Sequence, residues 1–133
     1  MMPVKTINYR FHHIGIPTTV RREGERYSST FKMYTSGGEE SPYRIQYHRF
    51  EEDCPLHPLI KTKMHVAFQV DDLQAAIEGQ EIILGPYEPF SGFKVVMIID
   101  SDAPIELIET TLSEEEIWYK NHNNSVIYPD DEC

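Results

Sequence analysis

The chain has 133 residues, a length that a single hydrophobic core usually serves. Hydrophobic residues make up 40% and charged residues 26%, which is ordinary globular usage and argues against a disordered or fibrous protein. The formal net charge of −10 opposes contact with phosphates and anionic lipids, which argues against nucleic-acid binding and a membrane-surface role. No apolar run approaches the roughly 20 residues of a membrane span, and the first residues lack the apolar core of a signal peptide, so we expect a soluble cytoplasmic protein.

Extended segments dominate the predicted secondary structure. Runs rich in Tyr, Phe, Val and Ile predict strands over residues 8–16, 27–35, 43–50, 64–70, 93–99 and 104–110. Turn-forming residues separate these runs at 17, 36–38, 55–58, 85–89 and 100–104. Strands separated by turns at these positions are typical of an α+β domain with short connections.

One amphipathic helix is expected over residues 71–78. Asp71 and Asp72 can cap its first turn, and Leu73 and Ile77 lie on one face at helical spacing. A glycine directly after this segment supplies the end of the helix.

The C-terminal part of the chain predicts a second, shorter helix. Ser113 and Glu116 have the spacing of a capping box, in which each side chain bonds the backbone of the other residue. The acidic segment 129–133 is expected to be a solvated tail. Cys54 and Cys133 are too few for a disulfide framework and are expected to be free thiols.

The chain contains an internal sequence repeat. The segment His-Ile-Gly-Ile at 13–16 returns in character as His-Val-Ala-Phe at 65–68, and each half closes on a similar strand, at 45–47 and at 105–107. We therefore expect one domain over 1–133 that consists of a first module at about 7–55, a second at about 62–112, and a helix with tail over 113–133.

Alternation along the predicted strands places four potential ligands on the faces opposite the apolar side chains. These residues are His13, Gln46, His65 and Glu106. Two imidazoles, a carboxylate and an amide oxygen suit one divalent ion such as Zn, Ni, Co, Mn or Fe. Such an ion could polarise a substrate carbonyl and stabilise the enediolate that forms when the adjacent carbon loses a proton.

Other polar residues have two interpretations. Arg44 shares the face of Gln46 and either anchors a substrate carboxylate or forms a surface ion pair. By alternation, His12 points away from His13 and is expected at the edge of the core or at an interface. Glu109 points away from the ligand face and is expected to be solvated or salt-bridged. His57 lies between two prolines and is expected to have a structural role in a connecting loop.

Three segments carry a family resemblance. HIGIP at 13–17, HVAFQVDDL at 65–73 and PIELIE at 104–109 resemble the vicinal oxygen chelate superfamily, which includes glyoxalase I, methylmalonyl-CoA epimerase, extradiol dioxygenases and the fosfomycin and bleomycin resistance proteins. The resemblance implies two βαβββ modules that curl into an open, barrel-like mixed sheet around a metal ion, usually in a homodimer. Residues 18–32 lack a helical period, so the helix of the first module is expected to be missing or replaced by strand.

The resemblance also implies roles for the candidate ligands. His13 matches the first-strand ligand, His65 the ligand that opens the second module, and Glu106 the last-strand ligand that can act as catalytic base. Gln46 takes the remaining place, as in epimerases of the superfamily, with His48 as its competitor. The implied function is a metal-dependent isomerase, epimerase or lyase that abstracts a proton beside the carbonyl of a small oxygenated substrate. The alternative is a metal-free small-molecule binding protein of the bleomycin-resistance type.

Overall fold

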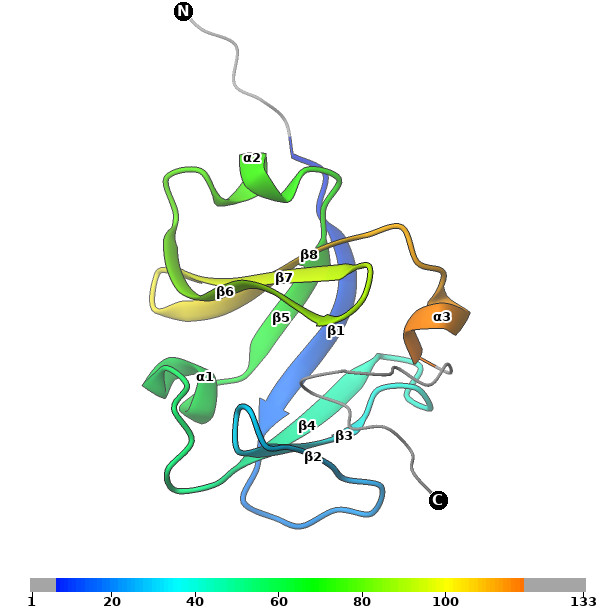
Figure 1. Cartoon of the computed structure of the whole chain (residues 1–133), viewed down its shortest axis with the longest axis vertical. Coiled ribbons are helices and arrows are strands. Elements are labelled where there is room, and N and C mark those ends of the chain that lie inside the picture. The colour runs from blue at the N-terminus through cyan, green and yellow to red at the C-terminus, as the bar shows by residue number, and fades with distance from the viewer. Residues whose placement is uncertain (1–6, 119–133) are drawn as a thin grey trace, which may run out of the picture.

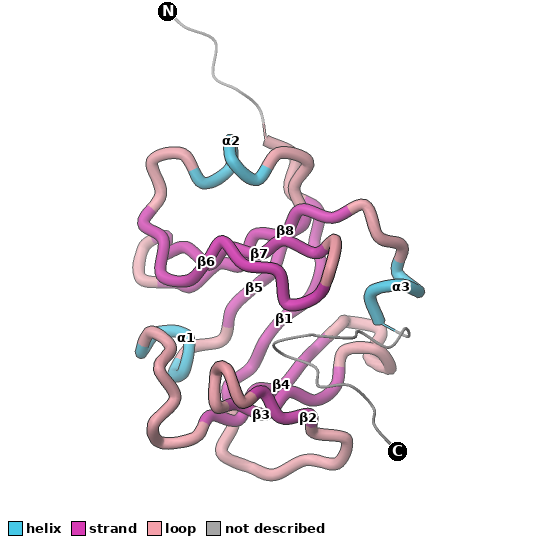
Figure 2. Tube along the Cα trace, viewed as in Figure 1, coloured by secondary structure: helices cyan, strands magenta, loops and turns pink. Residues whose placement is uncertain are grey.

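The computed structural model describes residues 7–118, which are built around one mixed sheet that curls into an open half-barrel (Figure 1). Its strands lie in the order β2-β3-β4-β1-β5-β8-β7-β6. They span Arg10–Pro17 (β1), Arg26–Ser28 (β2), Met33–Gly37 (β3), Ile45–Phe50 (β4), His65–Gln69 (β5), Glu81–Phe90 (β6), Phe93–Asp100 (β7) and Ala103–Thr110 (β8). In the same part of the chain, Figure 2 shows the short helices in cyan, namely Pro58–Thr62 (α1), Leu73–Ile77 (α2) and Glu114–Trp118 (α3).

The sheet repeats one strand arrangement on either side of its centre. β1 runs parallel to β4 and β5 runs parallel to β8, while β1 and β5 pair antiparallel between them. Gly15 is paired with Gln46 in the first half, and Ala67 is paired with Glu106 in the second. The second half has the order βαβββ, whereas residues 18–25 of the first half form turns and no helix. The predicted α+β fold is therefore confirmed, together with the missing first helix.

Alternate residues of the central strands pack on opposite faces of the sheet. Leu107 belongs to a buried cluster with α2, whereas its neighbour Ile108 belongs to a cluster with Trp118 of α3. A third cluster joins residues from both halves, with Met33 on β3 and Met97 on β7. Because Met97 is paired with Glu106, the inner face of the curled sheet holds both apolar core and the candidate ligands.

Strand β6 differs from the prediction, which places a break at residues 85–89. Pro86 and Pro89 lack the N–H group that a central strand needs. β6 lies at the edge of the sheet, and its pairing with β7 is irregular around both prolines. Proline is tolerated in such an edge strand because one side needs no hydrogen bonds from a neighbour.

Two further segments correct the predicted elements. The single strand expected over 27–35 is a hairpin, because the chain turns between β2 and β3. The linker expected around His57 contains α1, which begins at Pro58, a residue whose fixed φ suits the first helical position. The His57 ring accepts a hydrogen bond from Leu59 N at 3.1 Å, so its role is the structural one that we expected.

The predicted caps at Asp72 and Ser113 are confirmed, whereas the contact found for Asp71 is an ion pair with Arg10 at 2.9 Å. Asp72 accepts a hydrogen bond from Ala75 N at 3.1 Å at the start of α2. Ser113 and Glu116 bond each other's backbone reciprocally at the start of α3. Glu109 is half-buried and accepts a hydrogen bond from Leu73 N at 2.8 Å, so it also stabilises the first turn of α2, a role that was not predicted.

The cysteine and tail predictions are only partly tested. Cys54 is a buried free thiol, as expected. The other cysteine, Cys133, and the acidic tail at 129–133 lie outside the described residues. Among residues 7–118, none of the helices has the length and apolar character needed to cross a membrane.

Candidate metal centre

Three potential ligands from three central strands meet on the inner face of the sheet. His13 of β1, His65 of β5 and Glu106 of β8 each offer one atom, and these atoms lie within 4.8 Å of one another. Glu106 Oε1 is 3.1 Å from His65 Nε2 and 3.6 Å from His13 Nε2. The two imidazole rings are nearly perpendicular, with centroids 5.8 Å apart. This is a possible buried metal site, because two imidazoles and a carboxylate form a donor set for a divalent ion.

The strand registers bring these residues together. β5 lies between β1 and β8, so one ligand from each strand can converge on a single point. Gly15 is paired with His65, and a Cβ atom at position 15 would lie 2.1 Å from His65 Cε1. The His65 ring therefore occupies the space that any other residue at position 15 would fill, and the glycine is a steric requirement of the site.

The site is buried, and its carboxyl group favours the ionised form. The side chains of His13, His65 and Glu106 are 6%, 5% and 13% exposed. Burial opposes ionisation of Glu106, but the attraction of His13 and the contacts with both imidazoles outweigh it and hold the pKa of the carboxyl well below its usual range. Its 3.1 Å contact with His65 Nε2 is not a hydrogen bond, and that nitrogen has no hydrogen-bond partner among the described residues.

A small cavity of about 50 Å³ adjoins these ligands, enough for a few water molecules. Its apolar wall includes Tyr87, Phe90, Phe93 and Trp118. Phe90 and Phe93 also belong to the buried core, so these aromatic residues both wall the cavity and pack in the interior. The polar lining comprises His12, His13, Gln46, His48 and Glu106.

Both candidates for a fourth ligand line the cavity. Gln46 is 4% exposed and occupies in the first half the position that Glu106 occupies in the second. His48 Nδ1 is 3.0 Å from Thr35 Oγ1, while Nε2 is buried without a hydrogen-bond partner among the described residues. Burial, followed by the nearby His65, lowers the pKa of His48 to about 3 and keeps the ring neutral. The choice between Gln46 and His48 stays a prediction.

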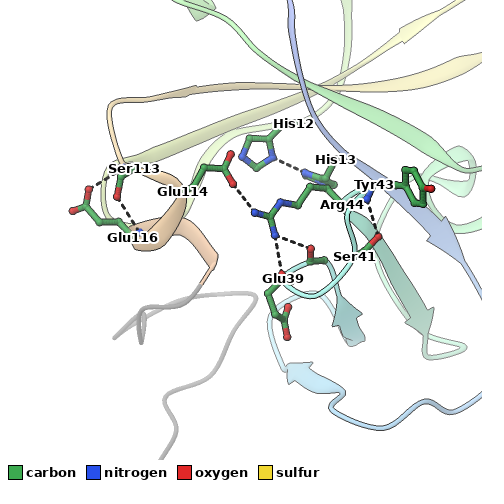
Figure 3. Close-up of polar contacts among 10 residues, drawn as sticks. His12, His13, Glu39, Ser41, Tyr43, Arg44, Ser113, Glu114 and Glu116 are labelled. Carbon is green, nitrogen blue, oxygen red and sulfur yellow. Dashed lines mark hydrogen bonds and ion pairs between the residues drawn. The ribbon is translucent and has the colours of Figure 1, made fainter.

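Arg44 forms an ion pair, which is one of the two roles predicted for it (Figure 3). Its Nη2 donates to Glu114 Oε2 at 2.8 Å, and its Nη1 donates to the carbonyls of Gly38 and Glu39 at 3.0 Å each. The guanidinium also lies 4.8 Å from the centroid of Trp118. Arg44 thus joins the loop before β4 to α3, and contact with a substrate stays a prediction.

His12 lies in the cavity, contrary to the prediction that it points away from His13. Phe11 is paired with Phe68 and His13 with Ala67, so His12 is the extra residue of a β-bulge. A bulge interrupts the alternation of side chains, which allows consecutive residues to face the same side. Burial and the nearby His13 lower the pKa of His12 to about 4. A bulge has no reliable signal in a single sequence, which is why alternation missed this residue.

Helix α3 covers one side of the cavity, which the sequence analysis also missed. Ile117 and Trp118 are 7% and 9% exposed and both line the cavity. The Trp118 ring stacks on His12, with centroids 5.5 Å apart. The capping box predicts where this helix begins, but no local signal indicates where the helix packs.

A scan against protein-family models and a search of curated proteins find no significant match to this chain. Without such a match, the geometry supports a less specific conclusion about function than the motifs imply. The protein has a strongly curled mixed sheet with a possible buried metal site at His13, His65 and Glu106.

Proposed function

We propose that the protein is a metal-dependent isomerase, epimerase or lyase of the vicinal oxygen chelate type, which acts on a small oxygenated substrate. The observation that carries the proposal is the convergence of His13, His65 and Glu106 within 4.8 Å beside a cavity. In this proposal the substrate occupies the cavity, and the protein functions as a homodimer, as the resemblance implies.

The residues present fit a divalent ion. An ionised carboxylate inside a protein is costly unless cations or hydrogen bonds compensate it. The two imidazoles favour the ionised form of Glu106 in the metal-free protein, and a bound divalent ion would supply the positive charge in their place. His65 Nε2 is buried without a hydrogen-bond partner among the described residues, so a lone pair on this atom is available to an ion. Gln46 or His48 would complete the set, and solvent or substrate would take the remaining positions.

Glu106 has a second role in this proposal. A bound divalent ion supplies Lewis acidity, which polarises a substrate carbonyl and acidifies the adjacent C–H group. Both contacts of Glu106 with the imidazoles use Oε1, so we assign Oε2 to proton abstraction. As a general base, Glu106 needs a substrate whose C–H group is acidified by the carbonyl next to it. The aromatic wall formed by Tyr87 and Phe93 would exclude water from that proton transfer.

Metal analysis of protein purified without chelator, then reloaded with Mn, Co, Ni or Zn, tests this proposal. We expect about one tightly bound ion per chain in the wild type and at least about tenfold weaker binding in Glu106→Gln and His65→Ala. Glu78→Gln, at an exposed position after α2, is the matched control and should bind like the wild type. Incubation of the loaded protein in D₂O with α-hydroxy ketones, 2-oxo aldehydes and acyl thioesters should then exchange the α-proton, as read by NMR.

The alternative function makes the opposite prediction. A metal-free binding protein would take up no ion under any loading condition, and its ligand affinity would be the same with and without added metal. Either that result, or metal binding that is identical in the wild type and both ligand variants, would contradict the proposed enzyme.

A further inference from the structure

The bulge in β1 creates a contact between two adjacent histidines. His12 Nδ1 and His13 Nδ1 are 2.8 Å apart, so one nitrogen donates a hydrogen bond and the other accepts it (Figure 3). We propose that His12 is a positioning residue that accepts this bond from Nδ1–H of His13, which leaves His13 Nε2 unprotonated and able to bind a metal ion. This inference rests on the metal site proposed above.

The direction of the bond follows from the position of the candidate metal site. His13 Nδ1 contacts His12, and His13 Nε2 is the nitrogen that faces Glu106, whose Oε1 lies 3.6 Å away. An ion at this site needs the lone pair of Nε2, and a neutral His13 ring with that lone pair carries its proton on Nδ1, so His12 accepts the bond. This arrangement leaves Nε2–H of His12 buried without a hydrogen-bond partner among the described residues, so it is favoured where an ion binds His13 Nε2.

Packing holds His12 in the orientation that this role needs. The residue is 6% exposed. Its ring lies 5.5 Å from Trp118 in a stacked arrangement and 5.5 Å from Phe93 at an edge-to-face angle of 62°. Metal-binding histidines in proteins generally donate the second ring N–H to a fixed acceptor, which sets the tautomer and the ring orientation. In this protein a neighbouring imidazole takes the place of the usual carboxylate or carbonyl.

Two substitutions separate hydrogen bonding from packing. His12→Phe retains an aromatic ring against Trp118 and Phe93 but removes the acceptor. His12→Asn loses the aromatic packing but places an amide oxygen close to the position of the imidazole Nδ1. We expect Zn²⁺ affinity to fall about 10- to 100-fold in His12→Phe and to recover to within about threefold of wild type in His12→Asn. A purely structural role predicts the reverse order, because only His12→Asn loses the ring.

The tautomers themselves can be measured without activity. Correlation spectra of the imidazole ¹⁵N nuclei should show His13 protonated at Nδ1 and His12 protonated at Nε2 in the Zn²⁺-loaded protein. A His13 ring without a proton on Nδ1 in the Zn²⁺-loaded protein would overturn the inference, as would wild-type Zn²⁺ affinity in His12→Phe. Failure of the wild type to bind any ion would instead overturn the proposed function, so the two failures are distinguishable.

Discussion

Gly15 is a single residue on which the whole candidate site depends. Its φ lies outside the left-handed region, so the reason for glycine is space and not backbone conformation. A Cβ atom there would lie within 2.8 Å of three atoms of the His65 ring. Any side chain at this position must therefore displace His65 from Glu106, its partner at 3.1 Å.

We expect Gly15→Ala to weaken Zn²⁺ or Co²⁺ binding by about tenfold or more, because His65 can no longer reach the ion, and a tenfold change corresponds to about 1.4 kcal/mol. Isothermal titration calorimetry measures the effect. Gly79→Ala is the control: it replaces a glycine with φ +77° in open space, so it should lower stability through backbone strain without changing metal affinity. Wild-type affinity in Gly15→Ala would contradict the assignment of His65 as a ligand.

At the scale of elements, α3 closes one side of the cavity through Ile117 and Trp118. Trp118 is packed between His12 on one side and the guanidinium of Arg44 on another. Gly38, with φ +102°, approaches this ring so closely that a Cβ atom would lie 2.6 Å from Trp118 Cζ3. The resulting cavity of about 50 Å³ is far below the 300–1,000 Å³ of typical ligand pockets. Entry of a substrate larger than a few water molecules therefore requires movement of α3 or of the aromatic wall.

Trp118→Ala should open the cavity and lower the free energy of unfolding by about 3–5 kcal/mol. Bound Zn²⁺ should then pass to a chelator faster than in the wild type, because α3 no longer covers the ligands. Urea unfolding and stopped-flow absorbance with a chromogenic chelator measure these effects. Glu114→Gln, whose carboxylate is 68% exposed, should cost less than about 1 kcal/mol and leave the release rate unchanged. Equal release rates in wild type and Trp118→Ala would show that α3 does not limit access.

For the whole molecule, the sheet places four imidazoles in one buried region. His12, His13, His48 and His65 are each between 5% and 8% exposed. They come from the adjacent strands β4, β1 and β5, which join the two halves of the fold. Burial disfavours the protonated forms of His12 and His48, and each of them has another imidazole beside it.

The metal-free protein should therefore lose stability as the pH falls from about 6.5 toward 4. An unfolded histidine binds its proton near pH 6.5. Burial and the neighbouring imidazoles lower the pKa of His12 to about 4 and that of His48 to about 3, so in this range the unfolded state binds protons that the folded state does not. Urea unfolding between pH 7.5 and 4.5 should show a decline that is smaller in His48→Phe. Stability that is flat or rises on acidification would contradict this expectation.

Much of the fold could be predicted from local signals. Runs of β-branched and aromatic residues predict the central strands, and Asp72 and Ser113 predict where two helices begin. These predictions succeed because strand propensity and helix capping depend on residues close together in the chain. The same local rules miss β6, because an edge position tolerates prolines that a central strand would not.

For the candidate site too, some residues could be predicted from the sequence and others could not. The sequence by itself determined that His13, His65 and Glu106 lie on one face of three strands, because side chains alternate in a regular strand and because the motif repeats. Only the tertiary structure decided that His12 joins them, since the bulge depends on pairing between β1 and β5. It also decided that Trp118 covers the cavity, because the packing of a short helix is determined by contacts with distant residues and not by its own residues.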